Sequence, residues 1–210
     1  MLSEVIGVDL GGTTIKGGRL SGGVLRNTFS LPSRSDVGGD VTMSVLFQVI
    51  ESLFTSNTEA IGLGVPSVVD KNLGIAYDFV NIRNWNIVEF KSILKQRFGV
   101  PVFVDNDANC FALSESRFGK GQKYSDFVGV TLGTGLGGGI IKNGKLMSDA
   151  NCGSGEFGLL PYRDSVFEVY CSSSFFVNKY GVSGYELAQK AVSGNADAIK
   201  AFYEYGRHLG

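Results

Sequence analysis

A glycine-turned segment occurs twice in the chain, and this repeat restricts the fold more than any other feature. Residues 5–13 read Val-Ile-Gly-Val-Asp-Leu-Gly-Gly-Thr, and residues 127–135, which begin 122 positions later, read Phe-Val-Gly-Val-Thr-Leu-Gly-Thr-Gly. In each copy an apolar run and a glycine turn lead into a second apolar run, which predicts a β-hairpin. A chance match is the alternative, but the shared layout favours two similar hairpins that each begin a domain. Two such hairpins facing each other would form a phosphate clamp across an interdomain cleft.

The first copy continues into residues that suit a bound phosphate. An apolar strand ends at Asp9, and two glycines, two threonines and Lys16 follow. Glycines leave backbone N–H groups accessible to a phosphate, and a carboxylate oxygen is a ligand that Mg²⁺ prefers. The stretch therefore indicates a nucleotide phosphate site. The alternative is a plain hairpin turn that needs glycine for its positive φ angle.

The second copy contains Gly133-Thr134-Gly135-Leu136-Gly137-Gly138, which satisfies the pattern G-x-G-x-x-G. A dinucleotide-binding fold needs a helix directly after those glycines. Residues 139–146 instead predict a strand, a turn and another strand. We therefore do not expect a dinucleotide fold here.

Composition excludes several classes of protein. The 210 residues suffice for one domain or two small ones, and a net charge of −1 gives no electrostatic footprint for nucleic acid. No apolar run approaches the roughly 18 residues of a membrane-spanning helix, and the first residues do not resemble a signal peptide. The three cysteines and the single histidine, His208, lack the close spacing of a zinc site. We expect a cytoplasmic protein with reduced thiols and no membrane partner.

Hydrophobic periodicity predicts alternating strands and helices. Strands are expected at residues 4–10, 13–20, 23–31, 61–65 and 101–105, and helices at 40–55, 88–98, from 106 onward, at 184–193 and at 195–209. Residues 66–87 and 149–183 predict irregular structure. The second half shows no counterparts of the later strands of the first half, which indicates an incomplete second domain.

Asp107 lies just past the end of the predicted strand at 101–105. The carboxyl ends of strands in an α/β sheet usually carry the ligand-binding groups. A carboxylate placed there can accept the proton of a hydroxyl nucleophile. The alternative is a simple helix N-cap, for which aspartate and asparagine are both well suited.

Five motifs in order resemble the ROK family (repressors, open reading frames and sugar kinases). They are Val8-Asp9-Leu10-Gly11-Gly12-Thr13-Thr14-Ile15-Lys16, Gly64-Val65-Pro66, Asn106-Asp107-Ala108-Asn109, Leu132-Gly133-Thr134-Gly135-Leu136-Gly137-Gly138-Gly139 and Gly155-Glu156-Phe157-Gly158. Asn81 and Trp85 also resemble an Asn-x-x-x-Trp stretch of that family. The resemblance implies an α/β, actin-like fold of two ribonuclease H-like domains, at residues 1–110 and 111–210, with the second domain incomplete.

The resemblance also implies an ATP-dependent kinase acting on a hexose or N-acetylhexosamine. The implied ATP-binding residues are Asp9, Gly11, Gly12, Thr13, Lys16, Thr134 and Gly135, with Asp9 reaching Mg²⁺ through water. Asp107 would be the general base, and the implied sugar-binding residues are Asn81, Asn106, Glu156 and Glu168. From the residues alone, Trp85 is better explained by packing, and either glutamate could be an ordinary surface carboxylate.

The chain departs from the family pattern at two places. Leu159 stands where the family usually has a histidine, and Cys171 is the only cysteine downstream, so we expect no zinc. The family's glycine-rich adenosine segment is not found, so the chain by itself is expected to be a weak or inactive kinase. The alternative function is a non-catalytic, sugar-sensing regulator of the same family. The sequence leaves the sugar open and is compatible with a homodimer.

Overall fold

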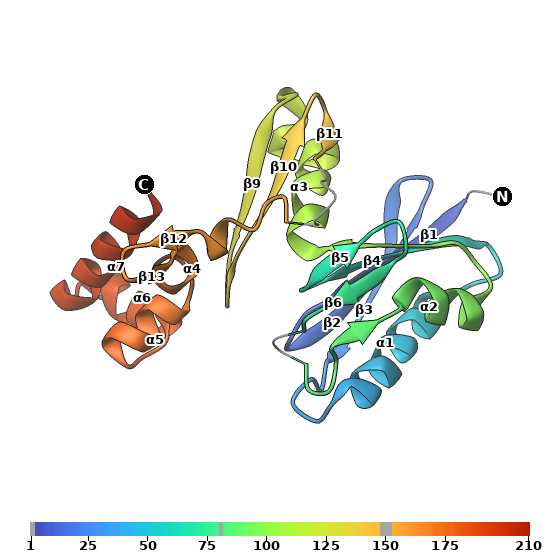
Figure 1. Ribbon diagram of the computed structural model, residues 1–210, viewed down its shortest axis with the longest axis horizontal. Coiled ribbons are helices and arrows are strands. Elements are labelled where there is room, and N and C mark those ends of the chain that lie inside the picture. Colours follow the sequence, from blue (N-terminus) through green and yellow to red (C-terminus); the bar gives the residue numbers. More distant parts are fainter. Residues whose placement is uncertain (1–2, 80–81, 148–152) are drawn as a thin grey trace. The chain divides into compact units, whose positions relative to one another are not determined.

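The computed structural model describes residues 3–79, 82–147 and 153–210 (Figure 1). Contacts between residues divide this part of the chain into two compact units. The first unit extends to Cys110, and the second begins at Phe111. The boundary falls inside one helix, α3 (Asp107–Phe118).

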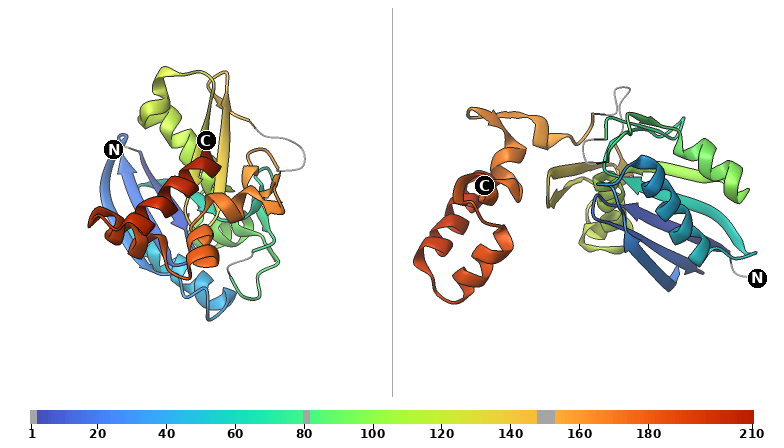
Figure 2. Two further views of the ribbon diagram at one scale, coloured as in Figure 1. Left: turned by 90° about the vertical axis from the view of Figure 1, so that its left-hand side faces the viewer. Right: turned by 90° about the horizontal axis from the view of Figure 1, so that it is seen from below.

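The first unit is built on a mixed five-stranded sheet in the order β3-β2-β1-β4-β8. Its strands are β1 (Glu4–Leu10), β2 (Thr14–Ser21), β3 (Val24–Pro32), β4 (Thr58–Val65) and β8 (Val102–Asn106). β1 pairs with β2 antiparallel and with β4 parallel, and β4 pairs with β8 parallel. Helices α1 (Gly39–Leu53) and α2 (Phe90–Phe98) pack on the sheet, as two views show (Figures 1 and 2).

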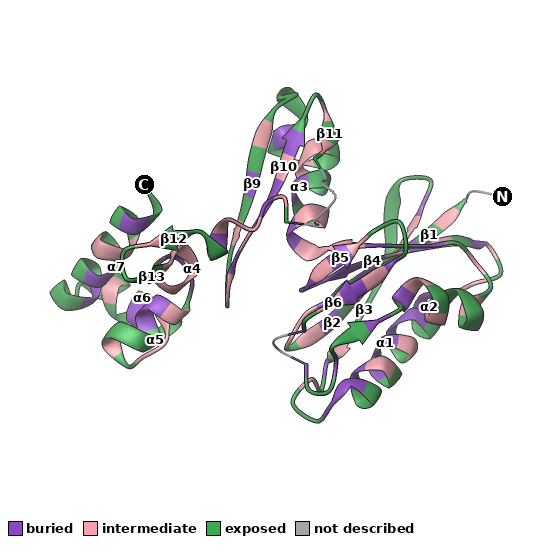
Figure 3. Ribbon diagram, in the orientation of Figure 1, coloured by how far each residue is buried: buried purple, intermediate pink, exposed green. Residues whose placement is uncertain are grey.

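The core of the first unit follows from the period of its apolar residues. Ile6, Val8 and Leu10 alternate along β1 and are 1%, 5% and 0% exposed. Helical spacing in α1 places Leu46 and Ile50 in the same core, where both are fully buried. Figure 3 shows buried residues along α1, α2 and the strands that they cover. Complete burial of such side chains contributes roughly 1.5–3 kcal/mol each.

The segment at residues 66–87, expected to be irregular, forms a small sheet. β5 (Val68–Asp70), β6 (Ile75–Tyr77) and β7 (Ile87–Val88) pair antiparallel in that order. The strands contain two or three residues each, which is too short for alternation to be recognised. The expectation of irregular structure is therefore wrong for these residues.

The second unit begins with the repeated hairpin. β9 (Phe127–Leu132), β10 (Leu136–Lys142) and β11 (Lys145–Leu146) form a sheet in the order β11-β10-β9. Val128, Val130 and Leu132 hold the positions of Ile6, Val8 and Leu10 in the repeat, yet they are 51%, 45% and 49% exposed. In the described part of the chain β9 has no parallel neighbour corresponding to β4 beside β1.

The rest of the second unit is mainly helical. It comprises β12 (Pro161–Tyr162), β13 (Ser165–Val166), α4 (Phe167–Cys171), α5 (Ser174–Tyr180), α6 (Gly184–Val192) and α7 (Ala196–Leu209). The expectation of irregular structure is thus wrong for much of 153–183, because these elements are short and lack a clear period. α6 and α7 are close to their predicted bounds, and each begins with a side-chain N-cap, from Ser183 and Asn195 respectively.

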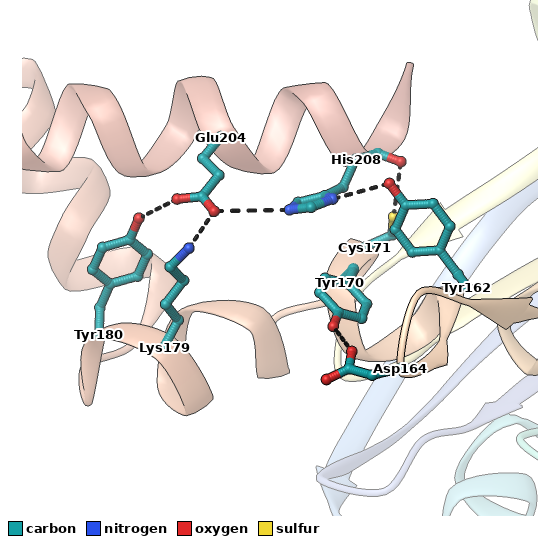
Figure 4. Close-up of polar contacts among 8 residues, drawn as sticks. All are labelled: Tyr162, Asp164, Tyr170, Cys171, Lys179, Tyr180, Glu204 and His208. Carbon is teal, nitrogen blue, oxygen red and sulfur yellow. Dashed lines mark hydrogen bonds and ion pairs between the residues drawn. The ribbon is translucent and has the colours of Figure 1, made fainter.

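Polar contacts join α5, α7 and the β12–β13 hairpin (Figure 4). Glu204 of α7 accepts hydrogen bonds from Lys179 and from the Tyr180 hydroxyl, the latter at 2.9 Å. On the same helix, Nδ1 of His208 lies 3.1 Å from the Tyr162 hydroxyl, and Nε2 lies 4.0 Å from a Glu204 oxygen. His208 is only 7% exposed, so these contacts hold a titratable ring inside the protein. None of the described helices combines the length and the apolar character needed to cross a membrane.

Candidate functional site

The carboxyl ends of three strands meet at one edge of the five-stranded sheet. β1, β4 and β8 run parallel, and their pairing places Asp9 opposite Gly64 and Gly64 opposite Asp105. β8 passes directly into α3, so Asp107 is the first residue of that helix. The polar residues at the ends of β1 and β8 therefore belong to one surface of the first unit.

The first glycine loop, residues 11–13, turns tightly between β1 and β2. The Gly11 amide donates to the Thr14 carbonyl at 3.0 Å, and a Cβ atom on Gly11 would lie 2.8 Å from that same oxygen. Only glycine fits this approach. Within the described residues, the amides of Gly12 and Thr13 donate to no protein acceptor. Free donors beside a lysine match the chemistry of a phosphate group.

Two serines hold this loop in place. The hydroxyls of Ser33 and Ser35 donate to the Gly12 carbonyl at 2.6 and 2.5 Å, and the Ser33 amide donates to the Thr13 carbonyl at 2.9 Å. The carbonyls of Gly12 and Thr13 are thereby occupied. Neither serine could be predicted as part of the site, because their contacts depend on β3 lying next to β2. The only signal in the sequence is the pair of serines at 33 and 35, just after a predicted strand.

Charges at this edge influence one another. Lys16 pairs with Asp9 across β1 and β2. Desolvation by the surrounding protein raises the pKa of Asp9, and the positive charge of Lys16 opposes that rise. Burial also raises the pKa of Asp107, and the negative charge of Asp9 raises it further, against the hydrogen bond from the Ala108 amide. A raised pKa makes the Asp107 carboxylate a stronger proton acceptor.

Asn106 is fixed by the fold at both ends of its amide. Its Oδ1 accepts from the Ala108 and Asn109 amides at 2.9 and 3.2 Å, which makes it the N-cap of α3. Its Nδ2 donates to the Ser67 carbonyl at 3.2 Å. One N–H of Nδ2 is left for a ligand. Asp107 Oδ1 also accepts from the Ala108 amide, at 2.8 Å, so the N-cap interpretation and a reactive carboxylate coexist in this residue.

The second glycine loop is supported by Glu168. Its Oε2 accepts from the Leu136 amide at 2.9 Å, and a Cβ atom on Gly135 would lie 2.5 Å from that oxygen. The Ser173 amide donates to the Gly133 carbonyl at 2.8 Å. Thr134 is exposed at the tip of the turn. Glu168 thus contacts the loop directly, which the sequence did not indicate.

The structure places the remaining predicted residues as follows. Glu156 is half-buried in the second unit and immediately precedes a short 3-10 helix, Phe157–Leu159. Asn81 lies outside the described residues. Trp85 is 8% exposed and packs edge-on against Phe79 and Phe90, with ring centroids 5.0 and 5.4 Å apart, in line with the packing interpretation.

Apart from Asp9, the sequence predicts no metal ligand. Leu159 is 62% exposed, and the Cys171 thiol is buried and lies 3.3 Å from the His208 carbonyl, to which it donates. Within residues 3–79, 82–147 and 153–210, no three His, Cys, Asp or Glu side chains gather as a metal site. The absence of zinc stays a prediction.

The sequence is similar to those of several characterised proteins. The chain is 34% identical to a glucokinase from Halalkalibacterium halodurans over 160 residues, covering 73% of this chain and 48% of the relative. It is also 34% identical to a xylose repressor from Caldicellulosiruptor bescii, covering 79% of this chain and 43% of that protein. The chain therefore spans about half the length of these relatives.

A solved structure shows the fold. A ROK family glucokinase from Streptomyces griseus, in complex with glucose and AMPPNP, matches 98% of this chain and 76% of its own, with 28% identity and a TM-score of 0.85. This confirms the expected actin-like α/β fold, with a second domain that is incomplete by comparison. The sequence model of the ROK family matches residues 5–203, so the chain belongs to the ROK family.

Proposed function

We propose that this chain carries the site of a sugar kinase, which transfers a phosphoryl group from ATP to a hydroxyl of a hexose or N-acetylhexosamine. The observation that carries the proposal is the position of Asp107. Its half-buried carboxylate lies at the end of β8, within the electrostatic influence of Asp9 beside the first glycine loop. A proton acceptor and a phosphate-binding loop on one surface are the two parts that transfer to an alcohol requires.

The residues present fit the phosphates of Mg-ATP. Gly12 and Thr13 offer amide donors, Lys16 offers a cation, and Asp9 offers an oxygen for a magnesium ion held through water. Thr134 and Gly135 would provide the second loop, whose backbone Glu168 supports. Mg-ATP supplies the phosphoryl group and neutralises charge that develops on it. The protein's part is to bind and orient the phosphates.

On the sugar side, Asp107 would take the proton of the attacking hydroxyl. Asn106 has one N–H for a sugar oxygen, because its other groups are bound within the fold. Asn81, Glu156 and Glu168 stay the sugar-binding residues that the resemblance implies. Oε2 of Glu168 already accepts from the Leu136 amide, so only its Oε1 would be available to a sugar. Carboxylates suit this task because they accept strong hydrogen bonds from hydroxyls.

The experiment that tests the proposal compares the wild type with Asp107→Asn. Phosphorylation of an aldose panel is followed by phosphorus NMR at high protein concentration, since this chain alone is expected to be weakly active. Asp107→Asn should abolish transfer and leave sugar-dependent thermal stabilisation intact, because the amide keeps the shape and loses the basicity. Asp70→Asn is the control, since Asp70 only accepts from the amides of Asn72 and Leu73 in an exposed turn. Unchanged transfer in Asp107→Asn would refute its role.

A second candidate is a sugar-sensing regulator without catalysis. It is favoured by one observation: the identity to the xylose repressor equals the identity to the glucokinase. The same experiment separates the two. Stabilisation by a sugar with no phosphorylated product, in the wild type and in a form extended to the length of the relatives, would favour the regulator. A cytoplasmic location, a homodimer and the absence of a nucleic-acid partner stay predictions.

A further inference from the structure

The turn from β8 into α3 contains a hydrogen-bonded pair that the proposed chemistry does not use. Oδ1 of Asp105 accepts from the Asn106 amide at 2.8 Å and from Nδ2 of Asn109 at 2.9 Å. One carboxylate oxygen thus joins the residue before Asp107 to the residue two positions after it. No loop separates strand and helix here, so the pair spans the whole junction.

The orientation of the Asn109 amide depends on Asp105. Oδ1 of Asn109 is buried and has no hydrogen-bond partner among the described residues, whereas its Nδ2 faces the carboxylate. The flipped amide would direct an oxygen at a carboxylate oxygen 2.9 Å away, which is repulsive. An unsatisfied buried carbonyl costs about 1–3 kcal/mol. The charge-assisted bond to Asp105 offsets part of this cost and fixes the side chain.

Asp107 lies inside this bonded frame. The Ala108 amide is shared between Asn106 Oδ1 at 2.9 Å and Asp107 Oδ1 at 2.8 Å. The direction of the Asp107 carboxylate therefore follows the geometry of the first turn of α3. Asp105 and Asn109 hold that turn from either side of Asp107, and neither uses the Asp107 carboxylate itself.

We propose that Asp105 and Asn109 are positioning residues, which together hold the Asp107 carboxylate in the orientation that it needs to reach the sugar hydroxyl. This rests on the proposed function. Reacting groups must be held closely, and a displacement of about 1 Å can cost about 10²-fold in rate. Loss of the pair should therefore lower kcat and leave the binding of the sugar nearly unchanged.

Steady-state kinetics of four variants and one control variant test the proposal. Asp105→Ala and Asn109→Ala should each lower kcat by about 10- to 100-fold, with the KM for sugar within about 2-fold of the wild type. The double variant should lose no more than either single variant, because both remove one interaction. Asp105→Asn should retain activity, since its carbonyl can accept both bonds. Asp70→Ala is the matched control, because it removes a carboxylate with two amide donors from an exposed turn.

Asn109→Asp covers the case in which an alanine variant fails to fold. It keeps the size of the side chain and sets two carboxylates against each other, so it should lower kcat in the same way. Unchanged kcat in the folded variants overturns the proposal, and so does a rise in KM without a fall in kcat, which would make Asn109 a sugar contact.

Amide hydrogen exchange separates failure of the pair from failure of the kinase assignment. In the wild type, the amides of Asn106 and Ala108 should be protected, and Asn109→Ala should expose them selectively, whereas Asp70→Ala should not. If neither the wild type nor a form extended to the length of the relatives phosphorylates a sugar, the proposed function fails, and the exchange result alone decides whether the pair fixes the turn. Equal protection in the wild type and in Asn109→Ala would refute it.

Discussion

Asn106 makes two separable contributions to stability, and replacing it in two ways should resolve them. Asn106→Ala removes the acceptor for the Asn109 amide and the donor to the Ser67 carbonyl. The Ala108 amide keeps its bond to Asp107. The cap is worth about 1 kcal/mol and the hydrogen bond to Ser67 about 1 kcal/mol, so unfolding should become easier by about 2 kcal/mol.

Asn106→Ser should remove only one of these two contributions to the free energy of unfolding. The serine hydroxyl can still cap α3, but it is too short to reach Ser67, so the loss should be about 1 kcal/mol. Urea unfolding followed by tryptophan fluorescence suits the measurement, because Trp85 is the only tryptophan and lies in the core of the same unit. With a slope of about 2 kcal/mol per molar urea, the midpoints should fall by about 1 M for alanine and about 0.5 M for serine.

Ser52→Ala is the control for this series. Its hydroxyl donates to the Gln48 carbonyl on the exposed side of α1 at 2.8 Å, and its loss should change stability by less than about 0.5 kcal/mol. Equal midpoints for the alanine and serine variants of Asn106 would refute the reasoning, because the cap would then contribute nothing.

Two further predictions concern titratable groups. Burial and the nearby carboxylates raise the pKa of the Cys110 thiol to about 12. In the folded protein at pH 8 this thiol should therefore react with iodoacetamide roughly 10³-fold more slowly than an ordinary thiol, because only the thiolate reacts. Peptide mass spectrometry after labelling measures the rate, and rapid labelling of Cys110 would contradict the prediction. Burial lowers the pKa of His208, so its contribution to stability is fully present above its unfolded value of about 6.5 and is lost as the pH falls through the folded pKa. Between pH 7.5 and 5, the melting temperature should therefore fall more steeply in the wild type than in His208→Gln. The neighbouring Glu204 adds little in that range, because its pKa is lowered from an already acidic value. Equal slopes of melting temperature against pH in the two proteins would contradict the prediction.

The hairpins and the strand-end residues could be predicted from the sequence because their signals are local. The strands predicted at 4–10 and 13–20 correspond to Glu4–Leu10 and Thr14–Ser21 in the structure, and the helix predicted at 40–55 corresponds to Gly39–Leu53. Each has a clear apolar period and a glycine or polar boundary. The same locality placed Asp9 and Asp107 at the ends of strands, where ligand-binding groups gather.

The supports of the site could not be predicted, because they depend on residues far apart in the chain. Ser33 reaches Gly12 only because β3 pairs with β2, and Glu168 reaches Leu136 from 32 positions away. The bond between Asp105 and Asn109 is local, but it depends on the exact residue at which α3 begins, and the sequence did not fix that residue. A single sequence carries no signal for contacts between residues that are distant in the chain.

The unequal burial of the two hairpins has a consequence for handling the protein. The face of β1 that holds Ile6, Val8 and Leu10 is buried, whereas the equivalent face of β9 exposes three aliphatic side chains, and among the described residues one edge of β9 has no strand partner. Apolar surface next to free backbone donors and acceptors attracts other chains. These 210 residues should accordingly self-associate as the protein concentration rises. Val130→Asp or Val130→Lys should reduce this association without disturbing the first unit.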